Sequence, residues 1–309
     1  MPLKATIKIL FSLAILALLF HEVHLEKALP YFKQMNFSYL ALTATVLLFG
    51  YLIAVFRWTL IMKSLKAPAA PLFYLKTYLK AIMFNQILPS NIGGDGYRMF
   101  EITKLGISKR LAITSVLADR AIGASGLVVI ALFSLPISYH LLPHKLFLIV
   151  LSTVVVSLSG ITFIIFLHRI RIRFLEKYFR WFYDLSNTLK DSYSSVTDLL
   201  FKLLLSVITN LCATVCFYLI ACALHVPCRL SDFLVIIPLV TLISMIPISM
   251  AGWGVRESAM VLLGAAIGIH HPAALAISLI YGMTSIVTSL PGFYLYFIHK
   301  DPAIPSLST

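Results

Sequence analysis

Two short stretches of the chain decide its fold: LPSNIGGDGYR at residues 88–98 and IPISMAGWGVR at residues 246–256. They align without a gap, and at a constant separation of 158 positions (256 − 98) they share a proline, two glycines and an arginine. Proline and glycine interrupt helices, and each stretch interrupts an apolar segment. We therefore predict two broken, re-entrant hairpins. The predicted break residues are Pro89, Gly93, Gly94, Gly96, Pro247, Gly252 and Gly254.

The remainder of the chain is predominantly apolar. Of its 309 residues, 60% are hydrophobic and 12% are charged, whereas soluble domains are roughly half apolar and about a quarter charged. Apolar runs near the roughly 20 residues that a spanning helix needs recur along the chain, and a separate segment satisfies its backbone in lipid only as a helix. The predicted fold class is an all-α polytopic membrane protein with about six spanning helices plus the two re-entrant hairpins. The six runs are 7–20, 39–62, 111–135, 146–167, 196–224 and 273–298.

The charge balance is strongly basic, with 25 Lys and Arg against 12 Asp and Glu, a net charge of +13. These basic residues lie in short loops beside apolar runs, which indicates orientation in a membrane and contact with anionic lipid rather than nucleic acid. Following the loop charges predicts a multi-pass protein of the cell (inner or plasma) membrane with both termini in the cytoplasm. Residues 174–193 are predicted to form an amphipathic interfacial helix, with Tyr178, Trp181 and Tyr183 at headgroup level.

The loop charges also give the two halves of the chain opposite orientations. A second match, LGI at 105–107 with IGI at 267–269, lies at a separation of 162 positions (267 − 105) and supports an inverted repeat. Chance similarity between glycine-rich loops is the alternative. Inverted repeats with broken helices place a substrate site near the membrane midplane. The predicted organisation is a single membrane domain, 1–309, with a first repeat at 38–135, a connecting segment at 136–195 and a second repeat at 196–298.

Charged residues inside the apolar segments are the candidate functional residues. Asp119 and Arg120 lie nine and ten residues beyond Arg110, a depth of roughly 14 Å, where a charge costs at least about 2.5 kcal/mol. Adjacent helical side chains point about 100° apart, so each of the two is expected to find its partner elsewhere, and Arg256-Glu257 repeats the arrangement. Arg98 and Arg256 follow the two breaks and form a candidate phosphate clamp, because arginine binds phosphate bidentately and stays charged. The predicted substrate-binding residues are Arg98, Arg120, Arg256, Asn85, Asp95, Asp119 and Glu257.

Structural interpretations remain open for the same residues. The central charges can form a purely structural ion-pair cluster, and Arg57-Trp58, near the inner end of its helix, is interpreted as an interface anchor. No metal or cofactor is expected: His270-His271 and His140-x3-His144 are assigned to outer loops, and the four cysteines match no zinc spacing. No P-loop motif is present, so ATP hydrolysis by the chain is not expected.

Taken together, these motifs resemble the transmembrane region of the lysylphosphatidylglycerol synthase/flippase family. The resemblance is carried by NQILPSNIGGDGYR at residues 85–98, by Asp119-Arg120 and by Pro247-x4-GWGVRE ending at Glu257, and it spans nearly the whole chain in order. It implies a membrane module that moves a modified phospholipid between leaflets. The synthases carry a soluble aminoacyl-transfer domain after the membrane part, whereas this sequence ends nine residues after Lys300, so aminoacyl-tRNA-dependent synthesis is not implied.

Three functions are consistent with the sequence. The first is a flippase- or scramblase-like translocase for an anionic phospholipid or a polyprenyl-phosphate-type lipid, since buried phosphate needs fixed cations. The second is a membrane-embedded enzyme acting on lipid-linked phosphate or sugar, for which Asp95 and Asp119 are the candidate acid–base pair. The third is an accessory subunit of a lipid-modifying enzyme. A homo-oligomer or such a partner enzyme is a possible assembly, and the translocase is the favoured prediction.

Overall fold

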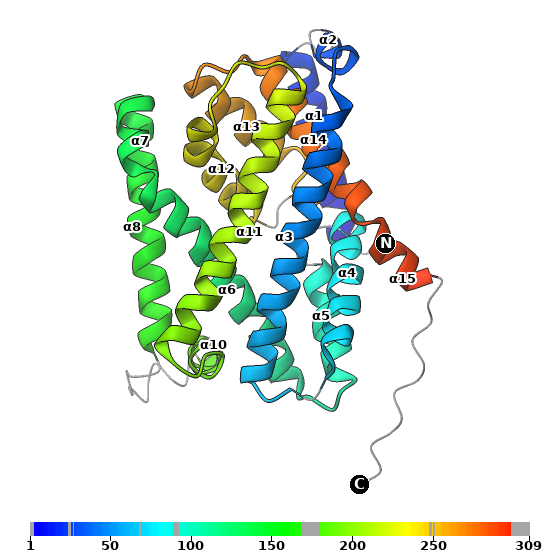
Figure 1. Ribbon diagram of the computed structural model, residues 1–309, viewed down its shortest axis with the longest axis vertical. Coiled ribbons are helices and arrows are strands. Elements are labelled where there is room, and N and C mark those ends of the chain that lie inside the picture. Colours follow the sequence, from blue (N-terminus) through cyan, green and yellow to red (C-terminus); the bar gives the residue numbers. More distant parts are fainter. Residues whose placement is uncertain are drawn as a thin grey trace.

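The computed structural model describes residues 3–23, 26, 28–67, 69–88, 93–167, 180–246, 249 and 251–297. All secondary-structure elements within these ranges are α-helices (Figure 1), which confirms the all-α prediction. The helices are α1 (Leu3–Val23), α2 (Leu29–Lys33), α3 (Phe37–Ser64), α4 (Pro71–Ile87), α5 (Gly93–Thr103), α6 (Lys109–Phe133), α7 (Leu135–Leu141), α8 (His144–Leu167), α10 (Arg180–Asp191), α11 (Val196–Ala223), α12 (Leu230–Ser244), α13 (Val255–Ala266), α14 (His271–Thr288) and α15 (Leu290–Phe297).

Five helical segments among the described residues are long and apolar enough to cross a membrane. They coincide with five of the six predicted apolar runs, and the sixth run, 7–20, lies within α1. The third of the five is only 11% buried, so α8 presents an almost continuous apolar surface to its surroundings, as a lipid-facing helix does. The five segments are Phe37–Ser64, Lys109–Phe133, His144–Ile164, Val196–Ala223 and His271–Phe297.

Side-chain caps mark where the long helices begin. Asn36 accepts a hydrogen bond from the backbone N–H of Ser38 at 3.0 Å before α3, and Ser195 accepts one from the N–H of Asp198 at 3.1 Å before α11. Ser108 caps α6 in the same way. Such caps satisfy backbone donors that have no partner within the helix. Polar residues at the ends of the apolar runs therefore fix the helix boundaries.

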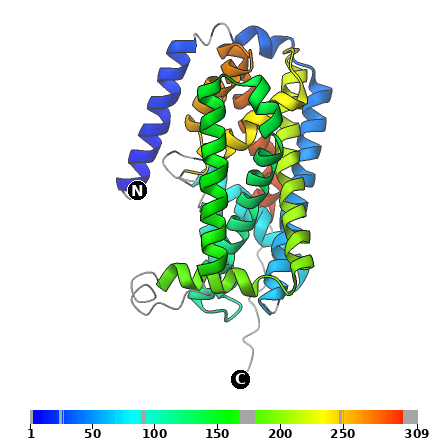
Figure 2. The ribbon, with the colours of Figure 1, turned by 90° about the vertical axis from the view of Figure 1, so that its left-hand side faces the viewer.

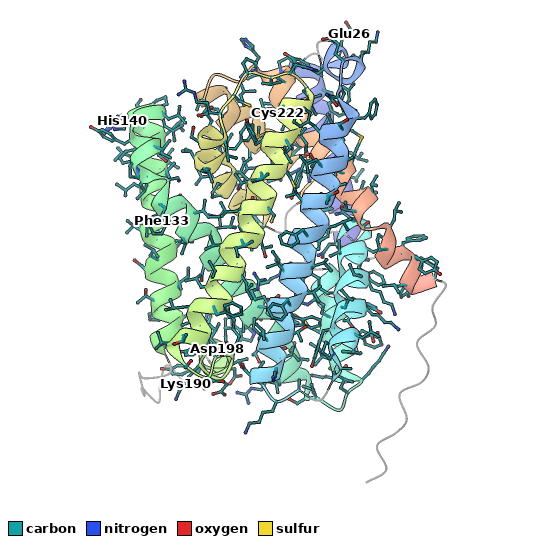
Figure 3. The ribbon with its side chains drawn as sticks, viewed as in Figure 1. Glu26, Phe133, His140, Lys190, Asp198 and Cys222 are labelled. Atoms are coloured by element: carbon teal, nitrogen blue, oxygen red, sulfur yellow. The ribbon has the colours of Figure 1, made fainter. Side chains whose placement is uncertain are left out.

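The bundle has two distinct ends, which Figure 3 identifies by labelled residues. Glu26, His140 and Cys222 lie toward one end, where α2 is found, and Lys190 and Asp198 lie toward the other, beside α10 (Figure 3). These are called the α2 end and the α10 end below. The long helix α3 runs from the α2 end to the α10 end, and α11 runs back beside it (Figure 1).

Two half-length hairpins occupy opposite ends of the bundle. Helices α4 and α5 pack together in the half toward the α10 end, and α12 and α13 pack together in the half toward the α2 end (Figure 1). Each of these four helices contains between 11 and 17 residues, which is a length of roughly 17–26 Å. None of the four is long enough to cross a hydrocarbon core of about 30 Å. The predicted break residues Pro89 and Pro247 lie outside the described residues, and the re-entrant course of the two hairpins remains a prediction.

The order of elements is the same in both halves of the chain. A long helix, a half-length hairpin and another long helix follow one another as α3–α4–α5–α6 and again as α11–α12–α13–α14. The two series begin at opposite ends of the bundle (Figure 1). This order is what an inverted repeat requires, and the repeat boundaries remain a prediction.

Small residues allow the central helices to approach closely. A Cβ atom on Gly50 of α3 would lie 3.2 Å from Cβ of Cys212 on α11, and one on Gly126 of α6 would lie 2.7 Å from the backbone carbon of Ser206 on α11. Helices in lipid associate through such van der Waals packing rather than through the hydrophobic effect. Helices α3, α6 and α11 therefore form a tight central trio.

Helix α10 lies across the α10 end of the bundle rather than along it (Figure 2). Its Leu185 and Leu189 pack into a core cluster with Ile61 of α3, while Trp181 is 47% exposed. Tyr183 is buried on the face of α10 that packs against the bundle, and its level relative to the headgroups remains a prediction. Tyr178 lies outside the described residues.

Candidate functional site

A cavity of about 370 Å³ with several charged lining residues lies between the two hairpins. Its walls come from both halves of the chain, namely α3 to α6 from the first half and α11 to α14 from the second. Six of the seven predicted substrate-binding residues line it, and Glu257 lies directly behind the lining residue Arg256. The charged lining residues are Arg57, Asp95, Arg98, Asp119, Arg120 and Arg256.

Arg98 of α5 is held by two carboxylates and two aromatic rings. Its Nη2 donates to Oδ2 of Asp119 at 2.7 Å and its Nη1 to Oδ1 of Asp95 at 3.4 Å. Its guanidinium carbon lies 4.2 Å from the ring centre of Trp58 and 4.7 Å from that of Tyr78, within the range of cation–π attraction. The side chain is 5% exposed. Arg98 therefore joins the first hairpin to α3 and α6.

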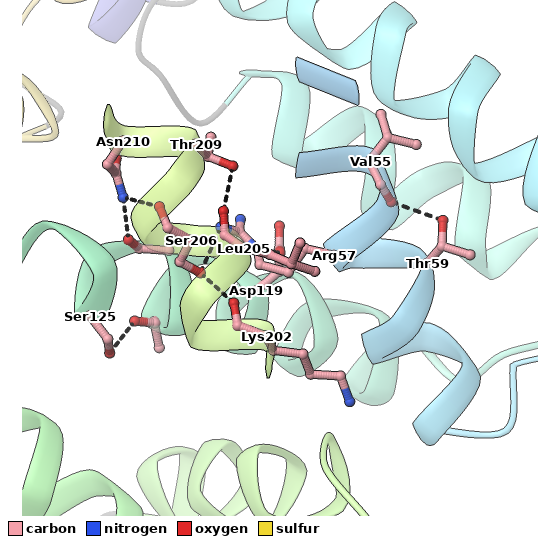
Figure 4. A network of polar contacts seen from close by, with 12 residues as sticks. Val55, Arg57, Thr59, Asp119, Ser125, Lys202, Leu205, Ser206, Thr209 and Asn210 are labelled. Carbon is pink, nitrogen blue, oxygen red and sulfur yellow. Dashed lines mark hydrogen bonds and ion pairs between the residues drawn. The ribbon is translucent and has the colours of Figure 1, made fainter. Parts of the chain in front are cut away.

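Arg57 of α3 belongs to the same cluster. Its Nε donates to Oδ1 of Asp119 at 3.0 Å and its Nη1 to the hydroxyl of Ser206 at 3.0 Å (Figure 4). The interpretation of Arg57-Trp58 as an interface anchor is therefore wrong, because both side chains are buried and Trp58 is 0% exposed. Arg57 is directed into the bundle, where two arginines share the single charge of Asp119.

Asp119 and Arg120 do not pair with each other, as their adjacent positions on a helix predict. Asp119 pairs with Arg57 and Arg98, whereas Nε of Arg120 donates to Oδ2 of Asp95 on the first hairpin. The Arg120 side chain is 25% exposed, the most exposed of the four arginines in the cavity. Arg57, Arg98, Arg120, Asp95 and Asp119 form one network, called the first cluster below.

The second half supplies a smaller cluster around Arg256. Its Nη2 donates to Oε1 of Glu257 at 2.6 Å and its Nε donates to the hydroxyl of Ser278 at 3.2 Å. The other oxygen of Glu257 accepts from the backbone N–H of Gly254 at 2.6 Å. The expectation that adjacent side chains diverge is wrong here, because both residues lie in the first turn of α13 and Glu257 folds back to cap it.

The two clusters resemble each other but are separate. Arg256 lies over the rings of Trp253 and Tyr281, at 5.0 and 5.6 Å, as Arg98 lies over Trp58 and Tyr78. No ion pair joins the two clusters among the residues that the structure describes. Asp119, Arg120 and Arg256 thus line one cavity from two sides, with Glu257 behind Arg256, and the four central charges do not form a single network.

Asn85 and the glycines hold the hairpins in shape. Oδ1 of Asn85, at the end of α4, accepts from the backbone N–H of Gly94 at 2.8 Å. A Cβ on Gly94 would lie 2.1 Å from the carbonyl oxygen of Ala81, and one on Gly93 would lie 2.5 Å from Cβ of Leu88. Gly96 meets nothing within 4 Å and lies inside α5.

In the second hairpin the glycines before α13 have left-handed backbone conformations. Gly252 and Gly254 have φ angles of 81° and 85°, and Ala251 beside them has 49°. These positive values are common for glycine and uncommon for other residues. The chain therefore turns at Ala251–Gly254 to begin α13, and Asn85 and Gly94 supply the corresponding closure in the first hairpin.

The cavity has an excess of one positive charge. Four arginines, at 57, 98, 120 and 256, face three carboxylates, at 95, 119 and 257. Within the first cluster alone, three arginines share two aspartates. Such an arrangement favours an anion over a cation or a neutral polar molecule.

The four histidines considered as metal ligands do not line the cavity. His140, His144, His270 and His271 are all exposed and lie at the start or end of helices. Among the described residues, no three His, Cys, Asp or Glu side chains are grouped closely enough to hold a metal ion.

These observations define a class: a multi-pass α-helical membrane protein with an arginine-lined cavity between two broken hairpins. A model of the family described as the lysylphosphatidylglycerol synthase transmembrane region matches residues 5–292. The chain belongs to this family, which confirms the resemblance. A comparison with curated proteins finds no match.

Proposed function

We propose that the protein moves an anionic phospholipid or a lipid-linked phosphate between the two leaflets of the cell membrane. The observation that carries the proposal is the cavity, which is lined by arginines from both halves and has one excess positive charge. A phosphate charge that leaves water for the membrane interior has a large desolvation cost unless cations meet it there. The fixed guanidinium groups supply that compensation.

The hairpins support a path to both sides of the membrane. Their half-length helices lie in opposite halves of the bundle (Figure 1), and in related architectures such half-helices expose a central site to each side in turn. In this proposal the α10 end is cytoplasmic, since basic loops favour that side. Both termini would then be cytoplasmic.

The test is leaflet exchange in proteoliposomes that contain a trace of phosphatidylglycerol with a fluorescent acyl chain. A membrane-impermeant quencher bleaches the outer leaflet, and the wild-type protein is expected to lower the fraction of lipid that escapes bleaching. Arg256→Gln is expected to slow the exchange at least tenfold, because its charge-assisted contacts are lost. Arg229→Gln, an exposed arginine in the same half, serves as the matched control.

The alternatives predict different results. Arg256→Lys, which keeps the charge, should retain more exchange than Arg256→Gln, and thermal unfolding confirms that each variant is folded. Exchange by folded Arg256→Gln at the wild-type rate would remove the cavity from the mechanism. Chemical conversion of a lipid-linked phosphate without leaflet exchange would favour the enzyme, and a copurifying lipid-modifying enzyme without exchange would favour the accessory subunit.

A further inference from the structure

The four arginines of the cavity are unequal in exposure. The side chains of Arg57, Arg98 and Arg256 are between 5 and 10% exposed, whereas Arg120 is 25% exposed. A guanidinium that is already enclosed by protein has few directions from which a ligand can approach. Arg120 therefore presents the most accessible positive charge to a molecule in the cavity.

Arg57 and Arg98 are also committed to contacts that join helices. Both donate to Asp119, Arg57 reaches Ser206 on α11 and Arg98 lies over Trp58 of α3. Withdrawing either one would leave a buried carboxylate with less compensation, which is strongly unfavourable. These two arginines hold the first hairpin and α6 in place rather than receiving a ligand.

The contact between Arg120 and Asp95 has a different property, because Asp95 has a second partner. Asp95 accepts from both Arg120 and Arg98. If an anion replaces Asp95 at Arg120, Asp95 keeps Arg98, and no carboxylate is left without a cation. The first cluster has three arginines for two aspartates, so one added negative charge brings it to neutrality.

We propose that Arg120 receives the headgroup phosphate of the transported lipid by exchanging Asp95 for a phosphate that bears a single negative charge, as in a phosphodiester. This inference rests on the proposed function and assigns unequal roles to the arginines: Arg120 binds the ligand, while Arg98 and Arg57 position the hairpin. Because Asp95 lies on α5 and Arg120 on α6, the exchange also removes one of the contacts between the first hairpin and α6.

Binding by the purified full-length protein in detergent tests the assignment. Dihexanoyl phosphatidylglycerol is the probe, and its apparent Kd is taken from the concentration dependence of the thermal unfolding temperature. Arg120→Gln is expected to raise that Kd about tenfold or more, since a charge-assisted bidentate contact is lost. Arg110→Gln removes an exposed arginine from the same helix outside the cavity and is expected to leave the Kd unchanged.

The variant Asp95→Asn distinguishes two roles for Asp95. It is either a competitor of the lipid phosphate for Arg120 or only a structural partner of Arg120. If Asp95 and the phosphate compete for Arg120, removing the carboxylate charge should lower the Kd for the lipid several-fold. If the pair only maintains the structure, Asp95→Asn should leave binding unchanged or weaken it, and that result would overturn the inference. A parallel titration with inorganic phosphate shows whether the bound phosphate is that of a lipid or free phosphate. If free phosphate binds in an Arg120-dependent manner and the lipid does not bind, the inference is also overturned.

The leaflet-exchange assay distinguishes this inference from the proposed function. Exchange by the wild-type protein, together with an unchanged Kd in folded Arg120→Gln, contradicts the role of Arg120 and leaves the translocase intact. Arg120-dependent lipid binding without any exchange by the wild-type protein contradicts the translocase and leaves Arg120 as a lipid-headgroup site.

Discussion

Gly94 determines how closely the two helices of the first hairpin approach. The position where its Cβ would lie is 2.1 Å from the backbone oxygen of Ala81 on the facing helix, a distance that no side chain can occupy. Its N–H also donates to Asn85. The residue thus combines a close backbone approach with a hydrogen bond that closes the hairpin, and it brings Asp95 and Arg98 to the cavity.

We predict that Gly94→Ala lowers the free energy of unfolding by about 1–3 kcal/mol, because the added methyl group forces the two backbones apart. Gly96→Ala is the matched control in the same helix. Nothing lies within 4 Å of its added Cβ, so it should be neutral or stabilise the protein by ~0.5–1 kcal/mol. Thermal or denaturant unfolding in detergent measures both; equal effects would show that the approach of α4 and α5 is not constrained at Gly94.

At the scale of single residues, the sequence predicted the central charged residues but not all of the side chains that contact them. Asp119, Arg120 and Arg256 stand out because charge in an apolar run is costly. Arg57 lies near the end of its helix, where a snorkelling arginine is ordinary. Only the packing of α3 against α11 directs it inward to Asp119 and Ser206. Trp253 and Tyr281 were missed because aromatic residues are common in membrane helices and carry no signal of their own.

At the scale of elements, α10 is joined to the bundle by polar contacts as well as by its apolar face. Asp184 pairs with Arg110 of α6, and the hydroxyl of Thr188 donates to that of Thr114 at 2.9 Å. Lys202 of α11 is fully buried and donates to the carbonyl of Ser192 at 2.6 Å, just after α10. The sequence predicted an amphipathic helix here, but such long-range contacts have no local sequence pattern.

Lys202 connects three parts of the α10 end, since it also donates to Ser64 at 2.9 Å and to Asp198 at 2.7 Å. We predict that Lys202→Met costs about 1.5–3 kcal/mol, the contribution of hydrogen bonds to a charged group. Amide hydrogen exchange in residues 180–191 should become faster. Lys190→Met, which replaces an exposed lysine on α10, should leave the hydrogen exchange unchanged. If α10 exchanges as slowly in both variants as in the wild-type protein, Lys202 does not hold α10 against the bundle.

At the scale of the whole molecule, two half-length hairpins enter a bundle of long helices from opposite ends. Their order along the chain was predictable, because proline, glycine and arginine recur at the same spacing in both stretches. Their depth was predicted from loop charges, which report the side of the membrane and not the distance across it. Arg98 and Arg256 both line one cavity. This follows from tertiary packing, which the local sequence does not report.

Orientation can be checked with single cysteines in sealed vesicles. His140→Cys, exposed at the α2 end, should react with a membrane-impermeant maleimide from outside, whereas Lys190→Cys, exposed at the α10 end, should react only after permeabilisation (Figure 3). Reaction of both from the same side would contradict the proposed orientation.

Three of the four native cysteines should contribute little background to this labelling, and the half-buried Cys222 is replaced by serine. Cys212 and Cys216 are buried, and burial raises the pKa of Cys228, in the loop before α12, to about 11. The raised pKa keeps this thiol protonated and slow to react near pH 7, with reaction accelerating as the pH rises toward 11. Rapid labelling of the Cys222→Ser protein at pH 7 would contradict this.

The close contact of Gly126 with Ser206, together with that of Gly50 with Cys212, has a consequence for motion. Helices packed this closely have little room to shift against one another, so we expect the long helices α3, α6 and α11 to form a stationary frame. In the proposed translocase, we expect the change that alternately uncovers the two sides to be taken up by the shorter helices, which would pivot around that frame.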